Sequence, residues 1–180
     1  MPSAFSRFTG FTLLELLVTV LVAALLLALA VPSFDAVLAR QRQSAEINAL
    51  FHAIHRARKE SIMRRRVVSI CPSPDGARCE PGRDWSAGWI VFENRDRDSP
   101  PAVDPGEAVL ERHRVDPRVR LTANRQGFTL RSTVQRATNG TLVACDTGGR
   151  IPAKALVVSW TGRPRVALRN TRGAPYACAD

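Results

Sequence analysis

The stretch from Gly10 to Phe34, "GFTLLELLVTVLVAALLLALAVPSF", determines how the chain begins. From Phe11 to Val31 it is almost entirely apolar, and as a helix it would reach about 30 Å, the thickness of a bilayer core. One carboxylate, Glu15, interrupts this run near its start. A carboxylate in hydrocarbon costs at least a few kcal/mol, so a segment that only crosses a membrane gains nothing from it. Glu15 therefore indicates a second role for this segment.

Two ordinary interpretations of the stretch leave Glu15 unexplained. The first is a plain signal anchor. The second is a cleaved secretory signal, because Ala28-Leu29-Ala30 has the small-residue pattern of a cleavage site. The apolar run is long for a secretory signal, and a charge within it is unfavourable.

A third interpretation accounts for the charge. The segment "FTGFTLLELLVTV" resembles the leader of type IV prepilins and type II secretion pseudopilins, although Arg7 is the only basic residue before Gly10. The resemblance implies that prepilin peptidase cleaves between Gly10 and Phe11 and that Phe11 is N-methylated. It also implies that Glu15, at the fifth mature position, is an assembly residue, neutralised by the terminal amine of a neighbouring subunit.

The rest of the chain predicts one helix followed by a β-rich domain. Pro32 predicts a kink rather than an end of the helix, and apolar residues then recur at helical spacing at Ile47, Leu50, Phe51, Ile54, Ala57 and Ile62. Short strands separated by turn residues are expected at 67–71, 89–93, 108–113, 119–123, 128–132, 141–145, 155–160 and 165–169. This pattern predicts an α+β fold in which the amphipathic half of the helix packs on an antiparallel β-sandwich.

Positive charge is concentrated in two parts of the chain. The formal net charge is +10, from 26 basic and 16 acidic residues. Residues 35–66 carry eight basic and three acidic side chains, and residues 145–180 carry six and two. Such clustering indicates an anionic partner, either nucleic acid or lipid headgroups, although a solvated basic surface is the simpler alternative.

The four cysteines indicate disulfides in an oxidising compartment. They contain no Cys-x-x-Cys pair, and no histidine stands at zinc-finger spacing from them. An even number of cysteines behind an export-type N-terminus predicts two disulfides. Three pairings are possible, and loop compactness favours Cys71 with Cys79 and Cys145 with Cys178.

No catalytic or metal site is evident. Asn94, Asp96 and Asp98 alternate like the start of a calcium loop, but Ser99 and Pro105 stand where such a loop needs Gly and Glu. His52 and His55 share a helix face without a convincing third ligand. No nucleophile, base and orienting group combine. We therefore expect no enzyme, no metal and no cofactor.

The segment "GRPR", residues 162–165, is the best candidate for a binding site. In an extended strand Arg163, Arg165 and Arg169 share one face, while Pro164, Val166 and Leu168 would supply an apolar inner side. Arg172 follows in a loop that Cys178 would anchor. Pro164 lacks a backbone donor, which favours an edge strand. Guanidinium groups suit phosphate oxygens, and since Trp160 and Tyr176 are the only aromatic residues nearby, binding should be mainly electrostatic.

This second half also resembles a known family. The segments "GWIVFENRDRD", "GEAVLE" and "GRPR" resemble the GspH/FimT branch of minor pilins and pseudopilins. The resemblance implies a type IV pilin-like fold with a leader at 1–10, a transmembrane and filament-core helix at 11–31, its amphipathic half at 32–66 and a periplasmic domain at 67–180. It implies a single-pass inner-membrane protein that becomes extracellular in a filament, with prepilin peptidase and other pilin subunits as partners.

Within this branch, FimT-type proteins use the Gly-Arg-x-Arg region to bind DNA during natural transformation. The resemblance therefore predicts a type IV minor pilin that binds double-stranded DNA non-specifically through phosphates, with DNA-binding residues Arg163, Arg165, Arg169 and Arg172. Three alternatives stay open. They are a GspH-like subunit of the type II secretion pseudopilus, a pilus-priming minor pilin without DNA binding, and a soluble protein released at Ala30.

Overall fold

A computed structural model describes residues 10, 12–132 and 137–178. It divides into two compact units, Met1–Val37 and Leu38–Asp180, and the helix α1 (Leu13–Arg64) contributes to both. The helix begins after Thr12, whose Oγ1 accepts a hydrogen bond from the backbone N–H of Glu15 at 3.3 Å, the bond of an N-terminal cap. Helical structure continues through Pro32, so the prediction that this proline does not end the helix is confirmed.

In the first unit, the apolar side chains of α1 face solvent. Leu13 is 77% exposed, and the large apolar residues from Leu14 to Leu27 are between 48% and 71% exposed. Among the residues that the structure describes, no helix combines the length and the apolar character needed to cross a membrane.

The second unit contains two antiparallel four-stranded sheets. The first has the order β3 (Val109–His113), β2 (Trp89–Glu93), β1 (Val68–Pro72), β5 (Phe128–Leu130). The second has the order β4 (Val119–Ala123), β6 (Gly140–Asp146), β7 (Lys154–Val158), β8 (Pro164–Ala167). Each of the eight predicted strands is present with both ends within two residues of the expected position. The predicted α+β fold with antiparallel sheets is confirmed.

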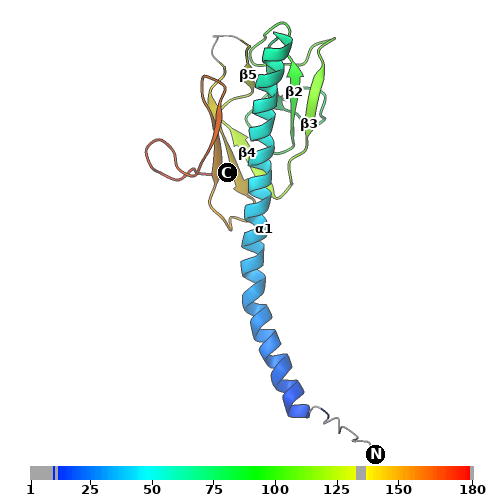
Figure 1. Ribbon diagram of the computed structural model, residues 1–180, viewed down its shortest axis with the longest axis vertical. Helices are drawn as coiled ribbons and strands as arrows, with labels where there is room; N and C mark the ends of the chain where they lie inside the picture. Colours follow the sequence, from blue (N-terminus) through cyan, green and yellow to red (C-terminus); the bar gives the residue numbers. More distant parts are fainter. Residues whose placement is uncertain (1–9, 11, 133–136, 179–180) are drawn as a thin grey trace, which may run out of the picture. The chain divides into compact units, whose positions relative to one another are not determined.

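The core of the second unit lies between α1 and the two sheets (Figure 1). Ile47, Leu50, Ile54 and Ala57 form the buried stripe of the helix, at most 1% exposed. They pack in one cluster with Trp85, which precedes β2, and with residues from both sheets, including Trp89, Leu121, Leu142 and Leu156. Burial of each large aliphatic side chain contributes about 1.5–3 kcal/mol. The predicted stripe is correct except at Ile62, which is 50% exposed.

Two buried polar residues of α1 fix the helix on the sandwich. The side-chain amide of Gln43 donates to the carbonyl oxygens of Ala144 (2.9 Å) and Pro152 (3.0 Å). Glu46 accepts a bond from the backbone N–H of Asp116 (3.0 Å) and contacts His113 Nε2 at 2.7 Å. These bonds have directional requirements, so they set the position of the helix along the sheets more strictly than apolar contacts do.

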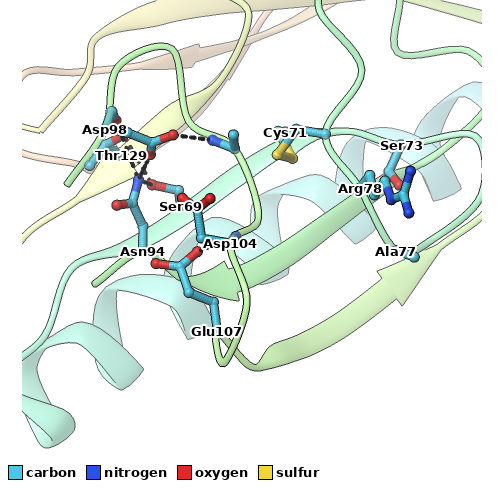
Figure 2. Close-up of a disulfide and its surroundings, with 12 residues drawn as sticks. Ser69, Cys71, Ser73, Ala77, Arg78, Asn94, Asp98, Asp104, Glu107 and Thr129 are labelled. Carbon is cyan, nitrogen blue, oxygen red and sulfur yellow. Dashed lines mark hydrogen bonds between the residues drawn. A yellow bond between two sulfur atoms is a disulfide. The ribbon is translucent and has the colours of Figure 1, made fainter. Parts of the chain in front are cut away.

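Both favoured disulfides are present in the structure, Cys71–Cys79 and Cys145–Cys178. The first lies near a buried polar cluster on β1 (Figure 2). In this cluster Asn94 Nδ2 donates to Ser69 Oγ (3.0 Å) and to Asp98 Oδ1 (2.8 Å), and Ser69 shares a 3.1 Å bond with Thr129. Asn94 and Asp98 therefore tie the loop between β2 and β3 to the first sheet.

Candidate nucleic-acid interface

The Gly-Arg-x-Arg segment forms the outer hairpin of the second sheet. Strand β8 is the edge strand and pairs with β7, with Pro164 opposite Val158 and Arg165 opposite Val157. Pro164 is buried, whereas the side chains on either side of it, Arg163 and Arg165, are exposed. The predicted edge strand is confirmed, and the two arginines lie on its solvent-facing side.

A tight turn at 159–162 presents these arginines. Gly162 donates its N–H to the carbonyl of Ser159 at 2.8 Å, and Ser159 donates its N–H to the carbonyl of Arg163 at 3.0 Å. Gly162 has φ +71°, in the left-handed region that favours glycine. A methyl group added to it would lie 2.9 Å from Nη1 of Arg58. The glycine of the motif therefore makes the turn possible, and Arg58 of α1 lies against its base.

The predicted inner side of this strand is wrong in part. Val166 is paired with the buried Leu156, but it is itself 45% exposed, and Leu168 is 60% exposed. The main core cluster reaches Leu156 and Val158 of β7 and, among the described residues, includes none of β8. Alternation along a strand determines which side a residue faces, but the extent of the core decides whether it is buried.

The expectation that Arg169 shares the strand face is also wrong. Strand β8 ends at Ala167, and Arg169 opens a loop that an isolated bridge to Pro175 closes. Its Nη1 donates to the carbonyl of Gly173 at 2.8 Å, which holds the loop in shape. The loop carries Arg172, projects from the edge of the second sheet (Figure 1, orange to red) and leads to the disulfide of Cys178.

This hairpin and loop carry an excess of positive charge. From Thr147 to Cys178 the sequence has no acidic residue and six basic ones. Within the described part of the chain, Arg163, Arg165 and Arg172 form no salt bridge, whereas Arg150 of this segment pairs with Asp146, and Arg56 and Arg64 on α1 pair with Glu111 and Glu60. The edge is therefore the part of the second sheet best suited to an anionic ligand.

Asp146 and Arg150 form a hydrogen-bonded ion pair next to the Cys145–Cys178 disulfide. Asp146 is 7% exposed, and Arg150 bonds both of its carboxylate oxygens, with Nε–Oδ2 at 2.9 Å and Nη2–Oδ1 at 2.8 Å. These hydrogen bonds lower the pKa of Asp146 to about 2. Arg150, unlike the arginines of the hairpin, is thus neutralised by a structural partner.

The other predicted site residues lie elsewhere. Gly10 is exposed before the helix, Phe11 lies outside the described residues, and Glu15 is exposed in the first turn of α1. The rings of His52 and His55 both contact Phe51 on the helix surface.

One acidic cluster could not be recognised from spacing in the sequence. The carboxylates of Asp96, Asp104 and Glu107 offer oxygens within 4.8 Å of one another, and Figure 2 shows Asp104 and Glu107 side by side. Desolvation and the neighbouring Asp96 raise the pKa of Asp104. Spacing alone groups Asn94, Asp96 and Asp98 instead, because it does not show how the loop between β2 and β3 returns on itself.

Two residues near the hairpin were also missed. Arg58 is separated from the motif by about a hundred residues, so no local pattern could connect them. In the sequence, Trp160 is distinguished only as one of the few aromatic residues near the motif, whereas in the structure it is 58% exposed in the turn. An aromatic residue in a turn directly before a basic motif is the signal that could have identified it.

Comparisons with known proteins identify the family. The model of the type II transport protein GspH matches residues 46–162, and the prokaryotic N-terminal methylation motif matches residues 5–31. No curated protein matches the sequence. The GspH match ends at Gly162, so the arginines of the hairpin lie beyond it.

Solved structures of minor pilins share the fold. The type IV minor pilin FimU of Pseudomonas aeruginosa PAO1 matches with a TM-score of 0.51 and 21% identity, over 77% of this chain and 99% of that chain. A second crystal form of FimU matches with a TM-score of 0.50 and 22% identity, over 77% of this chain and 94% of that chain. The minor pseudopilin EpsH from the type 2 secretion system of Vibrio cholerae matches with a TM-score of 0.48 and 10% identity, over 70% of this chain and 96% of that chain. The chain belongs to the GspH family and is a minor pilin or pseudopilin.

Proposed function

We propose that this subunit assembles into a type IV pilus and binds DNA through the hairpin of β7 and β8, as a receptor for natural transformation. The observation that carries the proposal is the placement of Arg163 and Arg165. Arg165 is exposed on the edge strand β8 and Arg163 is exposed directly before it, and neither has a salt-bridge partner among the described residues. They are the first candidates for phosphate contact, and Arg172 and Arg169 support them from the loop.

The chemistry of this surface favours phosphate over base recognition. Same-face residues of a strand lie about 6.6 Å apart, comparable to two steps of 3.4 Å along one DNA strand. Guanidinium groups donate pairs of hydrogen bonds to phosphate oxygens, and such contacts carry no sequence information. Binding through them should be non-specific and strongly dependent on salt.

The N-terminal region would anchor the subunit and then build the filament. We propose cleavage between Gly10 and Phe11, N-methylation of Phe11, insertion into the inner membrane before assembly, and a contact of Glu15 with the terminal amine of a neighbouring subunit. The match of residues 5–31 to the methylation motif supports the processing step. The exposed leucines and valines of the first unit support burial against lipid or other subunits.

The test is DNA binding by the full chain in neutral detergent. Affinity for a duplex is measured by fluorescence anisotropy at several salt concentrations, for the wild type and for Arg163→Ala/Arg165→Ala. Removing one phosphate-binding arginine lowers the slope of log affinity against log salt by about 0.9, so the slope of the double variant should be lower by about 1.8. Its affinity should also fall at every salt concentration.

A matched double variant controls for net charge. Arg78 and Arg114 are exposed, and they lie on loops beside β1 and β3 of the other sheet. Arg78→Ala/Arg114→Ala removes the same charge and should leave the salt slope close to the wild-type value. An equal effect of the two double variants would contradict a site at the hairpin.

A secretion role is the second candidate. The family model that matches this chain is named for type II transport, and its match to residues 46–162 excludes Arg163, Arg165 and Arg172. A wild type that fails to bind DNA even at low salt would favour a pseudopilus subunit.

A further inference from the structure

Trp160 lies in the turn that directly precedes the proposed phosphate contacts. It is 58% exposed, whereas the other two tryptophans, Trp85 and Trp89, are fully buried. A side chain of this size loses favourable burial by facing water, since indole is among the groups that gain most from leaving it. A ligand that covers the exposed part of the indole would therefore recover some of this burial.

The backbone of the turn holds Trp160 in place. Its carbonyl accepts a hydrogen bond from the N–H of Ala137 at 2.9 Å. Within the turn, Ser159 Oγ shares a 2.8 Å bond with Thr161 Oγ1 and accepts a bond from the N–H of Arg163 at 3.2 Å. The indole and the first arginine are thus presented by one short hydrogen-bonded segment rather than by two independent loops.

We infer that Trp160 is a stacking platform for an unpaired base and that this hairpin prefers single-stranded DNA. The inference rests on the proposed DNA-binding function and deepens it. In a duplex, the bases are stacked on one another, and only the phosphates reach Arg163 and Arg165. In a single strand, a base next to a bound phosphate can stack on the indole, and this stacking favours any base because every base has a π-face.

The experiment compares two DNA forms on the full chain in neutral detergent. The probes are a fluorescein-labelled thymidine oligonucleotide and its duplex with the complementary adenine strand. We expect the wild type to bind the single strand more tightly. Trp160→Ala should lower affinity for the single strand about tenfold and leave affinity for the duplex nearly unchanged. Trp160→Phe keeps an aromatic face and should retain most of the preference.

Intrinsic fluorescence gives a second, independent readout. Because Trp85 and Trp89 are buried, a change in tryptophan emission on adding the unlabelled oligonucleotide reports on Trp160. The change should be present in the wild type and absent in Trp160→Phe. This readout does not require Trp160→Ala to fold.

The outcomes separate this inference from the function on which it rests. A wild type that binds both DNA forms equally, with no change in tryptophan emission, overturns the stacking role but leaves DNA binding intact. A wild type that binds neither form at low salt overturns the proposed function itself. If Trp160→Ala loses the preference for the single strand and keeps its affinity for the duplex, the result supports both the stacking role of Trp160 and the proposed DNA-binding function.

Discussion

Gly162 shows how much the hairpin depends on a single residue. Its φ of +71° lies where other residues are strained, and its missing side chain leaves room for Arg58, Ala137 and Leu130. The glycine of the basic motif is thus a conformational requirement, and the arginines that follow depend on it for their position.

Replacing Gly162 by alanine should therefore destabilise the second unit. The left-handed backbone alone costs about 1–2 kcal/mol for a residue with a Cβ, and contact with Arg58 adds to it. Urea unfolding of the variant measures the decrease in stability. Gly173 is a matched control, because its φ is +79° but a methyl group there meets nothing within 4 Å. Equal decreases for Gly162→Ala and Gly173→Ala would show that crowding at the turn contributes nothing.

Asp146 makes a pH-dependent contribution to stability. Its pKa of about 2 in the folded protein is below the usual 3.8, so folding favours the charged form. This stabilisation is complete above about pH 4 and is lost as the pH falls toward 2. Because Arg150 is partly exposed and screened by solvent, the contribution should be on the order of 1 kcal/mol.

The comparison with Asp146→Asn tests this. The variant should be less stable than the wild type at neutral pH, and the difference should shrink as the pH falls from about 4 to about 2. Chemical unfolding at a series of pH values measures it. Parallel stability curves over this range would show that the pair with Arg150 stabilises nothing.

At the scale of elements, the strands were predictable and their pairing was not. Runs such as 89–93 combine β-branched and aromatic residues between turn signals, and these are local properties that a sequence displays. The order of strands within each sheet depends on contacts between distant segments, which one sequence does not reveal. The same limit explains Arg58, which lies on α1 far from the hairpin in sequence but next to Gly162 in the fold.

The edge strand shows where local patterns fail in detail. Pro164 correctly indicated an edge, because it cannot donate to a ladder. The continuation of the strand to Arg169 was wrong because the chain bends after Ala167 into the loop that ends at Pro175. Of the three arginines predicted to share the strand face, Arg165 lies in β8, Arg163 directly precedes it, and Arg169 lies in the loop that follows.

At the scale of the whole molecule, the two units suggest separate tasks. The second unit has its own core, and its candidate binding surface lies entirely within residues 38–180. The first unit offers an exposed apolar helix and the methylation motif. We expect the first unit to determine where the subunit resides and the second to determine what it binds.

Intact mass of the protein purified from cells with a prepilin peptidase tests the first of these tasks. We expect removal of residues 1–10 and an increase of about 14 Da from one methyl group on Phe11. Gly10→Val should abolish both changes, because the peptidase is expected to require the glycine. A mass that corresponds to release at Ala30, twenty residues further on, would replace the pilin interpretation with a secreted soluble protein.

The Cys145–Cys178 disulfide has a consequence for protein that has been cut by proteases. All six basic residues of the C-terminal segment lie between these two cysteines, so β7, β8 and the arginine loop form part of one covalent ring. A protease that cuts the exposed loop once opens the ring without releasing a fragment. The arginines then stay attached on both sides of the cut until the disulfide is reduced, and a nicked subunit keeps its full positive charge.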